Sequence, residues 1–143
     1  MKDREPQITE EQLLAEQIRK ARFVWICGNG GSASTSEHFA TDLVKKGLRA
    51  VALSANTSVI TMIANDYGYD QIFSRQLEAF ATPDDLLVTI SCSGTSPNIV
   101  NALEVARERN IPSYSFEVFG IETDYGLLED KHLAFAHEVA KSL

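Results

Sequence analysis

Two turns rich in glycine and serine are the segments whose residue types could bind an anion. The first spans residues 28–32 (GNGGS) and the second spans residues 91–96 (SCSGTS). Glycine allows close backbone approach to a ligand, and serine hydroxyls donate hydrogen bonds. Each turn precedes an expected helix, whose first N–H groups are unpaired and partially positive. The turns predict a phosphate site that needs no lysine or arginine, with these candidates: Asn29, Gly30, Gly31, Ser32, Ser91, Cys92, Ser93 and Ser96.

A plainer interpretation remains open for each turn taken alone. Glycine and serine also make tight strand-to-helix turns and cap helices without binding anything. Nucleotide motifs are not supported, because residues 28–32 do not fit G-x-G-x-x-G and the chain has no G-x-x-x-x-G-K-[ST] sequence. The pairing of two such turns is what favours a ligand site.

The chain has three histidines, and two of them combine with acidic residues at helical spacing. His38 and Asp42 are four residues apart on an expected helix, so they share one face. Glu129 lies about two turns before His137 on the expected last helix. Asp130, seven residues before His137, would share its face more squarely, so the choice between these two acids stays open. Such groups can transfer protons or ligate a metal.

The elements that must position these groups alternate between strands and helices. Apolar, β-favouring runs predict strands at 23–27, 48–53, 85–91 and 111–116. Apolar residues at helical spacing and capping residues predict helices at about 9–21, 34–46, 57–64, 71–80, 97–109 and from 125 to the end. This alternation predicts an α/β fold with a parallel sheet. Ligands of such sheets bind beyond the carboxyl ends of the strands, and both turns fall at that edge.

Bulk composition narrows the function classes. The 143 residues are 44% hydrophobic and 23% charged, which fits one globular domain spanning 1–143. The formal net charge of −7 argues against a nucleic-acid partner. Cys27 and Cys92 each end an apolar run and indicate buried thiols in a reducing compartment. No signal peptide and no membrane-spanning run is seen, so we expect a cytoplasmic protein without a membrane partner.

Three segments together resemble the phosphoheptose isomerase branch of the sugar isomerase (SIS) domain family. They are GNGGSAS…HFATDL, ANDYGYDQIFSRQLEA and SCSGTSPNIVNALEVARERN, and DYGLLEDKHLAFAH is similar to the last helix of that branch. The resemblance implies a flavodoxin-like three-layer α/β/α sandwich that assembles as a homo-oligomer, usually a tetramer and otherwise a dimer. It implies interconversion of sedoheptulose 7-phosphate and D-glycero-D-manno-heptose 7-phosphate. It also implies phosphate ligation by Ser32, Ser91, Ser93 and Ser96.

The resemblance also assigns roles to the acidic and imidazole groups. Asp42 corresponds to the catalytic base and His137 to its partner, while Asp66 would contact the sugar or support the catalytic group. Relatives use this set to hold zinc, which here implies His38, Asp42, Glu129 and His137, with Glu129 also near the substrate. Two nitrogens and two carboxylates suit zinc. The family usually has Glu at position 42 and often Gln at position 129, so this chain departs at both places.

The region after residue 116 is about twenty residues shorter than the family pattern. The sheet could be one strand shorter, residues 117–119 could be a remnant of that strand, or the chain could be stitched across a missing segment. Three functions therefore compete. They are a heptose 7-phosphate isomerase, a non-catalytic sugar-phosphate sensor or partner-binding protein, and an isomerase for a sugar of another length.

Overall fold

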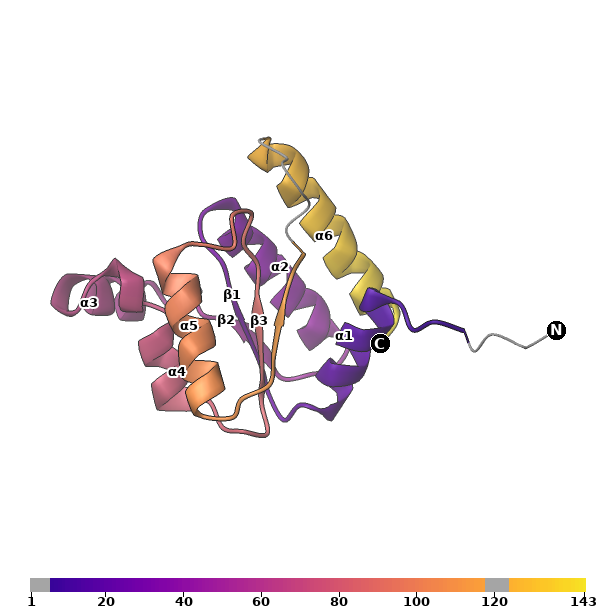
Figure 1. The fold of residues 1–143 in the computed structure, drawn as a ribbon, viewed down its shortest axis with the longest axis horizontal. Helices are drawn as coiled ribbons and strands as arrows, with labels where there is room; N and C mark the ends of the chain where they lie inside the picture. The colour runs from indigo at the N-terminus through magenta and orange to yellow at the C-terminus, as the bar shows by residue number, and fades with distance from the viewer. Residues whose placement is uncertain (1–5, 118–123) are drawn as a thin grey trace.

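The computed structural model describes residues 6–117 and 124–143, and Figure 1 shows its path. The strands are β1 (Val24–Cys27), β2 (Ala50–Ala52), β3 (Leu86–Thr89) and β4 (Ser113–Ser115). The helices are α1 (Glu10–Lys20), α2 (Gly31–Lys45), α3 (Thr57–Asp66), α4 (Ser74–Phe80), α5 (Pro97–Glu108) and α6 (Tyr125–Lys141), with a short 3₁₀ turn η1 (Tyr69–Gln71). The predicted alternation of strands and helices is confirmed.

The four strands form one parallel sheet in the order β2-β1-β3-β4. Val24 of β1 aligns with Ala50 on one side and with Leu86 on the other. This is the flavodoxin-like order without its fifth strand, with the change of direction between β1 and β3. The described residues thus give four strands, as in the shorter-sheet alternative. Residues 118 and 119 of the possible remnant lie outside the described residues.

Helices cover both faces of the sheet, which confirms the three-layer sandwich (Figure 1). On one face α1, α2 and α6 pack on Val24 and Ile26 of β1. On the other face α3, α4 and α5 pack on Trp25 and Cys27. All four β1 residues are buried, because side chains alternate between two covered faces. The buried strand β1 therefore holds in place the point where the first turn begins.

Local sequence accounts for where two of the helices begin. Thr9 caps α1 and exchanges hydrogen bonds with Gln12 in a capping box. Pro97 occupies the first turn of α5, where its missing N–H costs nothing. Helix α3 runs two residues beyond the predicted end at 64, because Tyr67 N–H still bonds to the Ile63 carbonyl.

Asp85 anchors the edge of the sheet opposite the two turns. Its buried carboxylate accepts hydrogen bonds from the Trp25 indole (3.0 Å), the Thr82 backbone (2.9 Å) and Arg22. Burial by itself would raise the pKa of Asp85, but these bonds and the charge of Arg22 outweigh it and lower the pKa. Across residues 6–117 and 124–143, none of the helices has the length and hydropathy to span a bilayer.

Candidate functional site

The first turn leads from β1 directly into α2. Gly30, the residue before α2, has φ +55° and ψ −121°, a conformation that favours glycine. No side chain caps the helix there, but the N–H groups of Ser32 and Ala33 donate to the Asn29 and Gly30 carbonyls (2.9 and 3.0 Å). The start of α2 therefore offers a ligand the positive end of the helix dipole more than a row of unpaired N–H groups. Ser32 is 5% exposed and lies in the first turn of this helix. The turn therefore presents both a helix N-terminus and a hydroxyl at the carboxyl edge of the sheet.

The second turn leads from β3 into α5 and is braced by its own hydroxyls. Ser91 Oγ accepts a hydrogen bond from Gly94 N–H (3.0 Å), and Ser93 Oγ accepts one from Thr95 N–H (3.2 Å). Ser96 precedes Pro97 at the start of α5 without a side-chain cap. The hydroxyls of Ser91 and Ser93 thus hold the loop in shape while their own protons remain available for donation.

A cavity of about 170 Å³ joins the two turns. It is lined by Asn29 and Ser32 from the first turn, by Tyr125 and Glu129 from α6, and by four residues of the second turn, Ser91, Cys92, Ser93 and Ser96. The structure therefore brings together side chains from both predicted turns. Burial raises the pKa of the Cys92 thiol, a hydrogen bond with Ser32 opposes this, and the Glu129 charge adds to it. Cys92 is a protonated thiol at neutral pH.

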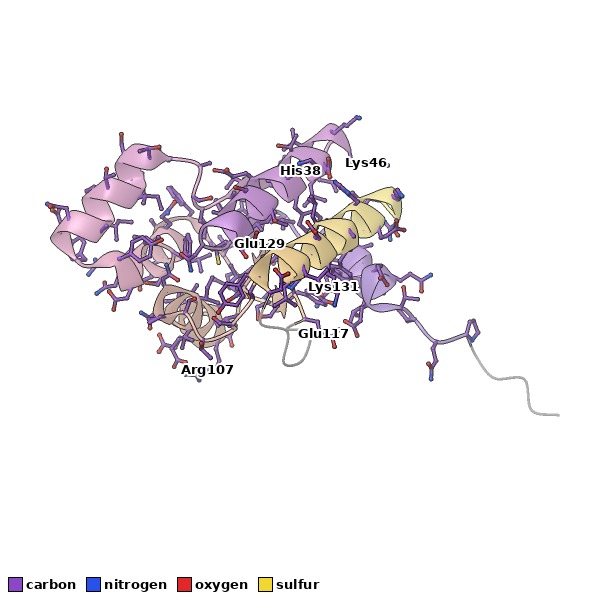
Figure 2. The ribbon with its side chains drawn as sticks, turned by 90° about the horizontal axis from the view of Figure 1, so that it is seen from above. His38, Lys46, Arg107, Glu117, Glu129 and Lys131 are labelled. Atoms are coloured by element: carbon purple, nitrogen blue, oxygen red, sulfur yellow. The ribbon has the colours of Figure 1, made fainter. Side chains whose placement is uncertain are left out.

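Glu129 reaches this cavity because a glycine opposes it. An added Cβ at Gly31 would overlap the Glu129 carboxyl group, so only glycine allows this approach at the start of α2. Figure 2 shows Glu129 on α6 and His38 on the adjacent α2. Asp130, the alternative acid, is exposed. Tyr125 was not predicted, although its spacing of four residues before Glu129 was a usable signal.

A second group of ligand-type side chains lies farther along α2 and α6. His38 and Asp42 share one face of α2 as predicted, with Nε2 and Oδ2 3.7 Å apart. His137 on α6 places its Nε2 3.0 Å from that of His38 and 3.9 Å from Asp42 Oδ2. The candidate ligand atoms all lie within 4.8 Å of one another. Glu129, the fourth predicted ligand, lines the cavity instead.

These three side chains fit a metal ion by their spacing. Zinc bonds of about 2.0–2.2 Å in tetrahedral geometry separate ligand atoms by about 3.3–3.6 Å. The observed separations of 3.0, 3.7 and 3.9 Å bracket that range. Two imidazole nitrogens and one carboxylate leave a further position for water or a substrate oxygen, as in catalytic zinc sites. The donor set therefore suits zinc or a similar divalent ion.

Two other residues discussed from the sequence lie apart from these groups. Asp66 is exposed at the end of α3, where its Oδ1 accepts a hydrogen bond from the neighbouring Asn65 (2.9 Å), and it does not line the cavity. His132, given no role, is 1% exposed and its Nε2 bonds with the Glu117 carbonyl (2.8 Å). His132 therefore supports the packing of α6.

A larger groove lies away from both groups. Its volume is about 510 Å³, and it lies beside the edge strand β2 among α3 and α4. Trp25, Val51 and Phe80 contribute much of its lining. None of the predicted site residues lines it, so its size does not make it the candidate site.

The fold and these groups define a class of protein. It is a flavodoxin-like α/β domain with a serine-lined cavity at the strand-order switch and an imidazole–carboxylate cluster farther along α2 and α6. The model of the SIS domain family matches residues 6–116, well over half of the chain. The chain therefore belongs to the SIS domain family.

Several proteins that are similar to this chain are named phosphoheptose isomerase. The phosphoheptose isomerase of Aliarcobacter butzleri is 44% identical over 110 residues, which cover 73% of this chain and 58% of that protein. That of Trichlorobacter lovleyi is 50% identical over 101 residues, covering 66% and 52%. The solved phosphoheptose isomerase of Neisseria gonorrhoeae superposes with a TM-score of 0.83 at 30% identity, covering 92% and 81%. The chain thus spans just over half the length of these two curated relatives.

Proposed function

We propose that this chain binds a sugar phosphate and interconverts sedoheptulose 7-phosphate and D-glycero-D-manno-heptose 7-phosphate. The relatives bear the name phosphoheptose isomerase. The phosphate enters the cavity between the turns, where Ser32, Ser91, Ser93, Ser96 and the start of α2 donate hydrogen bonds. Asn29 and Cys92 also line this cavity, and Gly30 and Gly31 form the turn beside it. Glu129 accepts hydrogen bonds from sugar hydroxyls.

One observation carries the proposal: the spacing between the cavity and the cluster. Ser32 and His38 are six residues apart on α2, and Glu129 and His137 are eight apart on α6. At 1.5 Å per residue these are separations of about 9 and 12 Å along the helices. An extended heptose 7-phosphate spans about 9–10 Å from phosphorus to C1, at roughly 1.2 Å per bond. Phosphate in the cavity therefore puts C1 and C2 near the cluster.

The cluster has the groups that an aldose–ketose isomerisation requires. A base removes the proton from the carbon beside the carbonyl, which gives an enediol, and returns it to the neighbouring carbon. Asp42 is the proposed base. His137 moves the hydroxyl proton between the oxygens on C1 and C2, so no proton is gained or lost overall. A six-carbon sugar phosphate would be only about 1.2 Å shorter, less than the difference between the two helix separations, so the choice of the seven-carbon substrate rests on the name of the relatives.

Zinc is the proposed metal, held by His38, Asp42 and His137, the three side chains whose spacing fits. Glu129 lies toward the cavity and is proposed for the substrate rather than for the metal. A bound zinc ion would polarise the carbonyl and hydroxyl oxygens of the substrate. Asp42 has two carboxylate oxygens, and Oδ2 is the one near both histidines, so Oδ2 would hold the metal while Oδ1 takes the proton.

Three broader properties are part of the proposal. Residues 1–143 act as one domain, which the two core clusters on opposite faces of a single sheet support. The chain assembles as a homo-oligomer, a dimer or a tetramer, for which exposed apolar side chains such as Val44, Met62 and Phe80 offer contact surface. It works in the cytoplasm, where phosphorylated sugars and reduced cysteines such as Cys27 and Cys92 both occur.

Asp66 would contact the sugar only from a neighbouring copy.

The test is turnover of sedoheptulose 7-phosphate with added zinc in deuterium oxide. We expect an aldose product with deuterium incorporated at C2, and loss of turnover in Asp42→Ala and His137→Ala. Asp130→Asn, an exposed acid on α6, is the matched control that should keep turnover. Absence of conversion by the unaltered protein at any zinc concentration would reject the isomerase proposal.

A binding-only role is the second candidate. The side chains of His38 and His137 are 51% and 43% exposed, whereas Ser32 is buried. Water therefore reaches the cluster freely, whereas Ser32 in the cavity is shielded from it. Thermal stabilisation by sedoheptulose 7-phosphate without any turnover would favour this sensor or partner-binding role.

A further inference from the structure

We propose that Asn98 is a positioning residue that locks the first phosphate turn to the second through Asn29. The expected effect of Asn98 on phosphate binding rests on the proposed function, because that function places the phosphate in this cavity. Asn98 lies in the first turn of α5, directly after Pro97. Asn98 belongs to the segment SCSGTSPNIVNALEVARERN, but the sequence patterns assign it no role, and it does not line the cavity.

The two asparagine side chains form a reciprocal pair. Asn29 Nδ2 donates to Asn98 Oδ1 at 2.8 Å, and Asn98 Nδ2 donates to Asn29 Oδ1, also at 2.8 Å. Both distances lie within the normal range for N–H···O bonds. The residues are 69 positions apart in the chain. The pair therefore connects the turn after β1 with the helix after β3.

A third group completes the arrangement around Asn29. The Tyr69 hydroxyl, from η1, donates to the same Asn29 Oδ1 at 3.1 Å. A carbonyl oxygen has two lone pairs, so Asn98 and Tyr69 together saturate it. One hydrogen of Asn29 Nδ2 is used by Asn98, and the other remains for a ligand in the cavity that Asn29 lines. The pair thus holds Asn29 in place beside the proposed phosphate cavity with one N–H not used by Asn98.

The first turn has few other side-chain constraints. Asn29 stands between Gly28 and Gly30, and α2 begins without a side-chain cap. Glycines give such a loop many conformations in the absence of a tether. Asn98 is 2% exposed, so its amide is held in a fixed environment where unmade hydrogen bonds are costly. The buried Asn98 side chain therefore holds the Asn29 side chain, and with it the first turn, in one position.

The test is a double-mutant cycle on the affinity for inorganic phosphate and sedoheptulose 7-phosphate, measured by calorimetry. Asn98→Ala should weaken binding about tenfold, and Asn29→Ala at least as much. In the Asn29→Ala background the further effect of Asn98→Ala should vanish, because Asn98 acts through Asn29. Glu104→Ala is the control on the same helix, since Glu104 is exposed and pairs with Arg107, and it should show no coupling to Asn29.

Independent losses from the two substitutions, or unchanged affinity in Asn98→Ala, would overturn the inference. Tyr69→Phe provides a variant on an exposed side chain, so folding is not at risk. It should weaken phosphate binding by about twofold to threefold, again only when Asn29 is present. An effect of equal size in Asn29→Ala would count against the arrangement.

A second measurement needs no ligand and no substitution at a buried site. In the unaltered protein, NMR should show the Asn29 side-chain amide with one slowly exchanging proton and with scalar coupling across the bond to Asn98. Rapid exchange of both protons would overturn the inference even if phosphate binds. Failure of the unaltered protein to bind any sugar phosphate, with the coupled amide present, would reject the proposed function and leave the positioning contact standing.

Discussion

His38 and His137 are 99 residues apart in the chain, yet their Nε2 atoms lie 3.0 Å from each other. Two ring nitrogens at this distance require that one carries a proton and the other does not, or that a cation lies between them. Asp42 Oδ2 is within 3.9 Å of both. The packing of α2 against α6 thus brings together the cluster of His38, Asp42 and His137, which neither helix contains alone.

Removing one imidazole should abolish tight metal binding. We expect the unaltered protein to bind one zinc ion per chain and His137→Ala to bind at least 100-fold more weakly, because one of three ligands is lost. Competition with a chromophoric chelator measures both affinities. Asp130→Asn on the same helix should bind zinc like the unaltered protein. Equal zinc affinity in His137→Ala and the unaltered chain would rule out this site.

Asp42→Asn should separate binding from catalysis. The substitution keeps the shape of the side chain but removes its basicity, so we expect kcat to fall about 10²- to 10⁴-fold. The dissociation constant for sedoheptulose 7-phosphate should change less than about threefold, because Asp42 does not line the proposed phosphate cavity. Steady-state kinetics and calorimetry measure the two quantities. A purely weaker affinity with normal kcat would contradict the role of Asp42 as base.

Gly31→Ala should disturb the cavity through Glu129. The new methyl group would overlap the Glu129 carboxyl group, which is the end of a flexible, partly exposed side chain and can swing aside, so we expect a cost of only about 0.5–1.5 kcal/mol. In a Glu129→Ala background the same substitution should cost much less. Urea unfolding of the four proteins measures this coupling. A cost for Gly31→Ala that is independent of residue 129 would show that the close approach is unimportant.

Asp85→Asn should destabilise the fold in a pH-dependent way. At pH 7 we expect a loss of about 3 kcal/mol, because a buried carboxylate with charged and neutral donors is replaced. The pKa of Asp85 is lowered in the folded state. Its contribution is therefore present above about pH 4, the ordinary aspartate value, and is lost as pH falls through the lower folded-state pKa.

Urea unfolding at a series of pH values measures the difference between Asp85→Asn and the unaltered protein. The gap should narrow as pH falls below about 4. Asp84→Asn, at the adjacent exposed position, is the control and should change stability by less than about 0.5 kcal/mol. A gap that is constant between pH 7 and pH 3 would show that the Asp85 charge contributes nothing.

The sequence by itself determined the features that depend on neighbouring residues. Glycine at position 30 permits a positive φ, Pro97 begins a helix, and alternating apolar runs define buried strands. The spacing of His38 and Asp42 placed both on one helical face. Strand-to-helix turns in a parallel sheet meet at one edge, so the sequence also predicted that the two turns lie together.

Only the tertiary structure decided which distant groups meet. The placement of α6 decides that Glu129 and not Asp130 lines the cavity, and that Glu129 lies apart from the histidine pair. The placement of α3 decides that Asp66 is exposed. The same holds for Asn98 against Asn29, whose contact requires β3 to lie beside β1. Local spacing fixes a side chain relative to its own helix axis. The relative placement of two helices comes from strand order and core packing across the whole chain.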